Sequence, residues 1–123
     1  MKVLAVDDEP TDLALYKALL SNYDIQVEPF LNVIEALDFL KSNKVDAVIS
    51  DMNMPFYSGI DFFLELKNKQ ILPPIFIYVT GHWEARYKHL LYKGVDQVFH
   101  KPFSHLDVAT FLQETRSQKR YGS

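Results

Sequence analysis

The stretch Val-Asp-Ala-Val-Ile-Ser at residues 45–50 is followed directly by Asp51, and it decides the fold prediction. A short, mostly apolar run of β-prone residues is typical of a strand buried on both faces of a parallel sheet. Four more runs of this kind occur along the 123 residues. The sequence therefore predicts five strands, at residues 2–6, 25–30, 45–50, 75–79 and 95–99.

Helical periodicity fills the intervals between these runs. Apolar residues recur there at spacings of three and four, which places them on one face of a helix. Pro10 suits a first helical turn, Asn32 suits an N-cap and Gly94 suits a helix stop. Alternation of strand and helix predicts an α/β domain, in which helices cover both faces of a five-stranded parallel sheet. The expected helices are residues 10–20, 33–40, 58–69, 84–92 and 106–115.

The composition limits the chemistry that the chain can perform. It contains no cysteine, which excludes disulfides, thiolate zinc sites and cysteine nucleophiles. The 13 Lys and Arg residues against 16 Asp and Glu residues give a net charge of −3. Because binding to a phosphate backbone requires a basic footprint, we expect no direct nucleic-acid binding.

Length and apolar runs set the expected organisation. The longest apolar stretch, residues 71–79, contains two prolines and is far shorter than the ~20 residues that span a bilayer. We therefore expect a cytoplasmic protein without membrane insertion. Residues 1–115 are expected to form one domain. The polar segment 116–123 lacks periodicity and is expected to be a frayed tail or a truncated linker.

Chemically active side chains follow four of the five predicted strands. Ligands of open parallel sheets bind outside the carboxyl ends of the strands. Those ends carry three carboxylates, one hydroxyl and one ammonium, which belong to Asp7, Asp8, Asp51, Thr80 and Lys101. The sequence therefore predicts that these groups converge at one edge of the sheet.

Three carboxylates in one pocket need a cation. Two unit charges ~4 Å apart repel by about 4 kcal/mol at an effective dielectric of 20. Oxygen ligands with no histidine or cysteine beside them favour Mg²⁺. Lys101 adds a positive charge suited to a phosphoryl oxygen. Each residue taken alone has an ordinary interpretation, since acidic residues stabilise a helix N-terminus and most lysines are solvated surface residues. The prediction of a shared site rests on their occurrence together at four strand ends.

Four motifs in order make the chain resemble the receiver domain of two-component response regulators, in particular the single-domain chemotaxis-type regulators. They are V-D-D-E-P at 6–10, S-D-M-N-M-P at 50–55, Y-V-T-G at 78–81 and H-K-P-F at 100–103. The resemblance covers residues 2 to about 115. It implies a doubly wound (βα)5 flavodoxin-like fold and a magnesium-dependent phosphorylation switch.

The resemblance also assigns roles to the strand-end residues. Asp51 would be the phosphoacceptor, taking a phosphoryl group from the phosphohistidine of a histidine kinase or phosphotransfer protein. Asp8, Asp51 and the main-chain carbonyl of Asn53 would bind Mg²⁺, and Asp7 would bind it through water. The chain would catalyse only its own phosphorylation and dephosphorylation.

Thr80 and Lys101 would each contact one oxygen of the phosphoryl group, and a cis Lys101–Pro102 peptide bond would aim the lysine into the pocket. The signal would leave through a face formed by helix 84–92, strand 95–99 and helix 106–115, which would bind a downstream protein or a second receiver. Two positions near the phosphoryl group, Asn53 and His82, would tune its hydrolysis.

One position departs from the family pattern. Receiver domains usually carry Tyr or Phe three residues before the lysine, and this chain has Val98 there, at the centre of the signalling face. Neighbouring strand residues point to opposite faces, so Phe99 does not replace the missing aromatic ring. This departure keeps open a phosphorylation-independent protein-binding module as an alternative function.

Two other classes of protein fit the residues at these strand ends less well. A haloacid-dehalogenase-type hydrolase needs a second aspartate two residues after the first, where this chain has Asn53, and the chain has no room for a cap domain. A flavodoxin-like cofactor binder needs a glycine- and hydroxyl-rich loop after the first strand. The acidic residues 7–9 would instead repel a phosphate.

Overall fold

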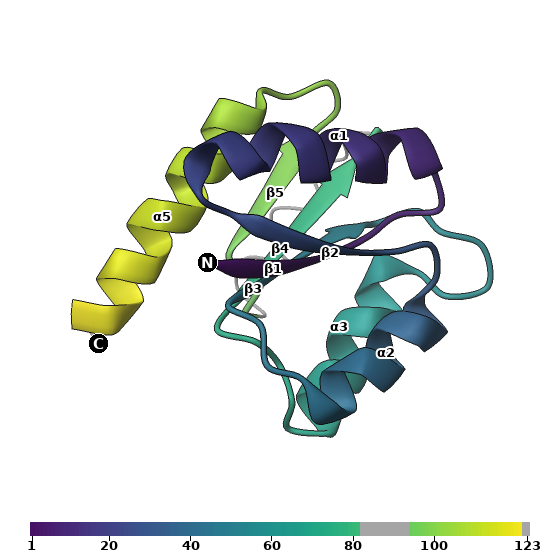
Figure 1. The fold of residues 1–123 in the computed structure, drawn as a ribbon. Helices are drawn as coiled ribbons and strands as arrows, with labels where there is room; N and C mark the ends of the chain where they lie inside the picture. The colour runs from purple at the N-terminus through teal and green to yellow at the C-terminus, as the bar shows by residue number, and fades with distance from the viewer. Residues whose placement is uncertain (82–93, 122–123) are drawn as a thin grey trace.

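A single parallel sheet forms the centre of the protein in a computed structural model that describes residues 1–81 and 94–121 (Figure 1). Its strand order is β2-β1-β3-β4-β5, and every neighbouring pair is parallel. The strands are β1 (Lys2–Val6), β2 (Gln26–Phe30), β3 (Ala47–Asp51), β4 (Ile75–Thr80) and β5 (Gln97–His100).

Helices cover both faces of this sheet. Helices α1 and α5 lie on one face, and α2 and α3 lie on the other (Figure 1). The doubly wound α/β prediction is therefore confirmed, although the helix expected at 84–92 lies outside the described residues. The described helices are α1 (Pro10–Leu20), the 3-10 turn η1 (Ser21–Tyr23), α2 (Val33–Ser42), α3 (Gly59–Asn68) and α5 (His105–Tyr121).

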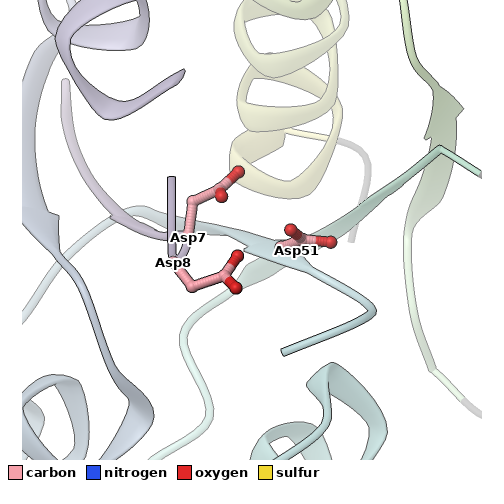
Figure 2. A group of neighbouring side chains, drawn as sticks. All are labelled: Asp7, Asp8 and Asp51. Carbon is pink, nitrogen blue, oxygen red and sulfur yellow. The ribbon is translucent and has the colours of Figure 1, made fainter. Parts of the chain in front are cut away.

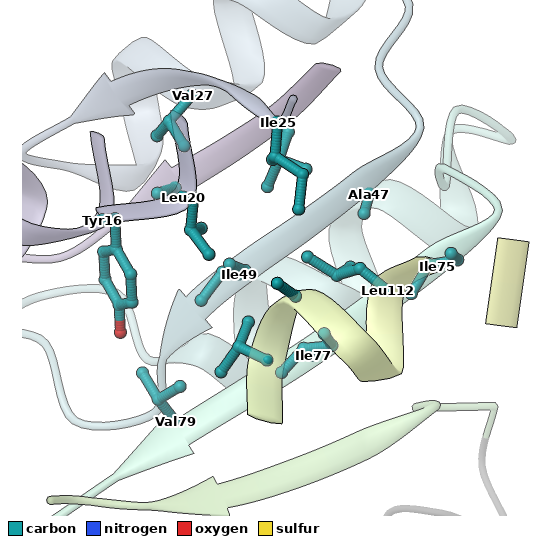
Figure 3. Packing of buried hydrophobic residues seen from close by; sticks show 14 of the residues in the cluster. Tyr16, Leu20, Ile25, Val27, Ala47, Ile49, Ile75, Ile77, Val79 and Leu112 are labelled. Carbon is teal, nitrogen blue, oxygen red and sulfur yellow. The ribbon is translucent and has the colours of Figure 1, made fainter. Parts of the chain in front are cut away.

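Alternating side chains of the central strands build two apolar cores. On β1, Leu4 packs into the core beneath α2 and α3, whereas Val3 and Ala5 pack into the core beneath α1 and α5. Figure 3 shows the packing of labelled residues in the second of these cores. All residues of β3 and β4 are buried. Burial of one large aliphatic side chain contributes roughly 1.5–3 kcal/mol. The rigid sheet that results fixes the strand ends that carry the candidate site.

The connection from β3 to α3 is held tightly against the sheet. Ser58 caps α3, and its side chain and that of Asp61 form a reciprocal capping box. The Tyr78 hydroxyl donates a hydrogen bond to the Gly59 carbonyl oxygen at 2.7 Å. A Cβ atom at Gly59 would lie 2.6 Å from the carbonyl oxygen of Asp51, so only glycine allows this approach.

The last helix differs from the prediction. It begins at His105 and continues to Tyr121, so the expectation of a frayed segment through residues 116–121 is wrong. The Lys119 ammonium lies 2.8 Å from Asp96 Oδ1 and also donates to the carbonyl oxygen of Pro74. These polar contacts hold the last turns of α5 against the sheet. Because they involve no apolar periodicity, the sequence did not predict them. Within the described residues, no helix is long and apolar enough to cross a membrane.

Candidate functional site

Three aspartates meet at the carboxyl ends of β1 and β3. Each of Asp7, Asp8 and Asp51 offers a carboxylate oxygen, and these oxygens lie within 4.8 Å of one another (Figure 2). The sheet register explains the meeting, because Val6 pairs with Ser50 and the residue that follows each of them in the chain is an aspartate. The predicted convergence of the acidic residues is confirmed.

The three carboxylates differ in their surroundings. Asp7 and Asp51 are buried, whereas Asp8 is exposed. The amide of Glu9 donates to Asp7 Oδ1 at 2.9 Å, and the amide of Asn53 donates to Asp51 Oδ1 at 3.1 Å. The pKa of Asp7 is raised to about 6, because burial and the nearby Asp51 charge, which raise it, outweigh the Glu9 amide and Lys101, which lower it.

Lys101 brings an ammonium into the same cluster from the far end of β5. Its Nζ donates to Asp7 Oδ2 at 3.1 Å and to Asp12 Oδ2 at 2.9 Å, and lies 3.7 Å from Asp51 Oδ2. Burial alone would lower the pKa of Lys101, but the Asp12 hydrogen bond and the Asp51 and Asp7 charges outweigh it and raise that pKa. The Lys101–Pro102 peptide bond is cis, as predicted.

Asp12 is the member of the cluster that sequence reasoning missed. It lies in the first turn of α1, where an acidic residue has an ordinary role as a partner of the helix dipole. Nothing in the sequence distinguishes that role from a contact with a lysine 89 positions away. The tertiary fold creates this contact.

Thr80 and Asn53 complete the site on the β4 side. Thr80 is fully buried at the end of β4, and the Asn53 side-chain amide donates to its Oγ1 at 3.3 Å. The resemblance assigned Asn53 a main-chain carbonyl for the metal and a place near the phosphoryl group, but the contact of its side chain with Thr80 was not predicted. Thr80 therefore lies within reach of the loop that follows Asp51. His82 lies outside the described residues.

The two residues considered for the aromatic switch position face opposite sides of the sheet. Val98 packs against the core beneath α2 and α3, whereas Phe99 packs against the other core and faces the rings of Phe103 and Phe111. The alternation expected for β5 is confirmed. The part of the expected signalling face in residues 84–92 lies outside the described residues.

The donor set fits a hard divalent cation. Magnesium prefers carboxylate and carbonyl oxygens, and three aspartate oxygens lie close enough together to share one ion. Among the described residues, the three carboxylates outnumber the Lys101 ammonium beside them, so the pocket carries excess negative charge. A divalent cation would relieve this excess.

Comparison with known proteins identifies the family. The model of the response regulator receiver domain matches residues 3–113. The chain belongs to this family. The receiver domain is 32% identical over 109 residues to the sensor histidine kinase RcsC of Escherichia coli, covering 88% of this chain and 11% of RcsC. It is 24% identical to the regulatory protein VanRc of Enterococcus gallinarum, over 98% of this chain and 52% of VanRc.

A solved structure agrees with this assignment. The receiver domain of a response regulator from Clostridium thermocellum is 28% identical, with a TM-score of 0.83, and the match covers 99% of this chain and 98% of that one. The receiver domain described here spans about half or less of the length of the two curated relatives.

Proposed function

We propose that this receiver domain is a signalling switch that accepts a phosphoryl group on Asp51. One observation carries the proposal: the Asp51 carboxylate lies among two further carboxylates, with an ammonium 3.7 Å away. Such a pocket combines a nucleophile with positive charge to receive a dianionic group. The donor would be the phosphohistidine of a histidine kinase or phosphotransfer protein.

Four residues would hold the metal ion. Asp8, Asp51 and the main-chain carbonyl of Asn53 would bind Mg²⁺ directly, and Asp7 would bind it through water. When bound, Mg²⁺ supplies positive charge that neutralises the transferring phosphoryl group. The clustering of carboxylate oxygens and the exposure of Asp8 to solvent support this assignment.

The remaining groups would orient the transfer. A carboxylate oxygen of Asp51 forms a bond to phosphorus while the phosphorus–nitrogen bond of the donor breaks, and that electron pair leaves with the imidazole. The Asn53 amide restricts rotation of the Asp51 carboxylate. Thr80 would donate to one phosphoryl oxygen and Lys101 would pair with another. These reactions on its own Asp51 would be the only chemistry of the domain.

Replacement of the acceptor tests the proposal. We expect wild-type protein to gain a phosphoryl group from acetyl phosphate in the presence of Mg²⁺, and Asp51→Asn to gain none while staying folded. The amide has almost the same shape as the carboxylate and is a poor nucleophile. Intact-mass measurement reports the gain, and circular dichroism reports the fold.

A matched control is Asp38→Asn, which removes an exposed carboxylate on α2. This variant should be phosphorylated at the wild-type rate. A stable phosphoryl group on the Asp51→Asn variant would place the acceptor elsewhere and refute the proposal.

A second candidate function is a protein-binding module that acts without phosphorylation. Val98 favours it, because this small side chain is packed against the core at the position where the family usually has an aromatic ring. The two functions differ in how a downstream partner binds. Equal affinity for wild-type protein with and without beryllofluoride would favour the module, whereas a difference would favour the switch.

A further inference from the structure

Asp12 makes the shortest of the three carboxylate contacts of the Lys101 ammonium. Its Oδ2 accepts a hydrogen bond from Lys101 Nζ at 2.9 Å, compared with 3.1 Å for Asp7 and 3.7 Å for Asp51. Two of the three ammonium donors are therefore used by Asp12 and Asp7. The Asp51 carboxylate lies beyond hydrogen-bond distance of the same nitrogen.

The position of Asp12 on α1 explains why the ammonium stops short of Asp51. Charge-assisted N–H···O bonds normally shorten to about 2.7–2.9 Å, so an unrestrained ammonium would close on the buried Asp51 carboxylate. Asp12 is half-buried at the outer side of the cluster and holds the ammonium there. The lysine is thus shared between a carboxylate of α1 and a carboxylate of β1.

This placement matters for the proposed reaction. An oxygen of Asp51 that accepts a hydrogen bond from an ammonium is a weaker nucleophile, because its lone pair is engaged. A phosphoryl group on Asp51 extends beyond the carboxylate, so its own oxygens enter the gap between Asp51 and Lys101. An ammonium held at 3.7 Å forms an ion pair with Asp51 but no hydrogen bond, so it can meet such an oxygen without first breaking a hydrogen bond to the nucleophile.

We propose that Asp12 is a positioning residue that holds the Lys101 ammonium back from Asp51 and ready for the incoming phosphoryl oxygen. The inference rests on the proposed phosphorylation of Asp51 and adds a residue that acts through Lys101. During transfer Lys101 keeps its protons, and its hydrogen bonds redistribute toward the new oxygen. Asp12 itself touches neither phosphorus nor the donor.

Asp12 also has a simpler role to be distinguished, which is stabilisation of the α1 N-terminus by its negative charge. A role through the helix would not depend on Lys101. A role through the ammonium disappears when the ammonium is removed. A double-mutant cycle with Lys101 therefore separates the two.

The experiment measures the phosphorylation rate with saturating acetyl phosphate and Mg²⁺ by intact mass. We expect Asp12→Asn to slow the reaction roughly ten-fold, less than the roughly 100-fold that a 1 Å misplacement in an active site can cost. In the Lys101→Met background the same substitution should change the rate by less than about twofold, the usual error of additivity. Asp38→Asn, the matched removal of an exposed carboxylate, should leave the rate unchanged.

Two results would overturn the inference: an unchanged rate in Asp12→Asn, or an equal loss in both backgrounds. A second measurement needs neither metal nor phosphodonor. The ¹⁵Nζ resonance of Lys101 should move in Asp12→Asn and stay in place in Asp38→Asn. An unmoved resonance in Asp12→Asn rejects the inference, even if Asp51 proves to be phosphorylated. A wild-type chain that gains no phosphoryl group refutes the proposed function, and the inference falls with it.

Discussion

At the scale of single residues, Asp7 is a carboxylate whose burial in the folded protein removes it from water. Its pKa of about 6 exceeds the ordinary value of 3.8 mainly because burial disfavours the charged form. The folded protein therefore binds this proton more tightly than the unfolded chain does between about pH 4 and pH 6. As a result, stability due to this group falls as the pH rises through that window.

We predict that Asp7→Asn stabilises the metal-free protein at pH 7. The free energy of unfolding should rise by on the order of 2 kcal/mol, because the variant avoids burying a charge. The side-chain oxygen of the new Asn can still accept the hydrogen bond from the Glu9 amide. Most of the gain should vanish by pH 4, where the wild-type carboxyl is protonated in the folded state and about half protonated in the unfolded chain. Urea unfolding at several pH values measures it.

The comparison variant for Asp7→Asn is Asp38→Asn on the solvent side of α2, which changes the net charge equally. An Asp7→Asn variant that is less stable than wild type at pH 7 without metal would show that the Lys101 contact outweighs the cost of burying Asp7. The prediction would then be wrong.

The residues that the sequence analysis identified are those whose role follows from their place at a strand end. Asp7, Asp8 and Asp51 could be predicted because the register of β1 and β3 brings adjacent strand ends together. Asp12 and the Asn53 side chain could not, since their contacts depend on the angle of α1 and on the course of a loop. Neither the angle of α1 nor the course of that loop can be read from a pattern of residues in the sequence.

At the scale of elements, β5 carries Val98 three residues before Lys101. This side chain is β-branched and partly buried against the core beneath α2 and α3, so it has little freedom at χ1. An aromatic ring could swing between two packings, but valine cannot. We therefore predict that phosphorylation acts mainly through the loop that begins at Thr80 and Gly81, with a shift of the segment 84–92.

Backbone amide shifts recorded with and without beryllofluoride and Mg²⁺ test this prediction. The largest changes are expected at Thr80 and Gly81, with Val98 nearly unchanged. Affinity for a downstream partner should change by about 1–3 kcal/mol, the range of typical allosteric coupling. Large changes centred on Val98 and Phe99, with Thr80 and Gly81 unmoved, would contradict it.

Element prediction succeeded where apolar periodicity was present and failed where other forces act. The strands were located to within two residues, because strands buried on both faces read as continuous apolar runs. The end of α5 was missed because an ion pair of Lys119 with Asp96 supports that turn. Pairing across 23 positions leaves no periodic signal.

At the scale of the whole molecule, the fold concentrates negative charge at one edge of the sheet. Asp7, Asp8, Asp12 and Asp51 converge there, and Lys101 is the ammonium that contacts this cluster among the residues the structure describes. This repulsion is built into the folded state and is weaker in the extended unfolded chain. A ligand that removes it and binds only the folded state must therefore stabilise the whole domain.

We predict that Mg²⁺ raises the thermal stability of the wild-type protein and has a much smaller effect on Asp8→Asn. At a concentration of about ten times Kd, binding to the folded state contributes about 1.4 kcal/mol. For a domain of this size that corresponds to a rise in Tm of roughly 4–6 °C. Asp8 is exposed, so its replacement removes a charged ligand without disturbing the core, and the metal-free variant should be at least as stable as wild type.

Sodium chloride at equal ionic strength is the necessary control, because salt alone screens repulsion between exposed carboxylates. Screening would stabilise wild type and Asp8→Asn to similar extents and would not saturate. Binding at a defined site saturates and depends on the ligand set. Differential scanning calorimetry over a range of Mg²⁺ concentrations distinguishes the two. Equal stabilisation by Mg²⁺ and by sodium chloride would mean that the acidic cluster holds no specific metal ion, despite the closeness of its oxygens.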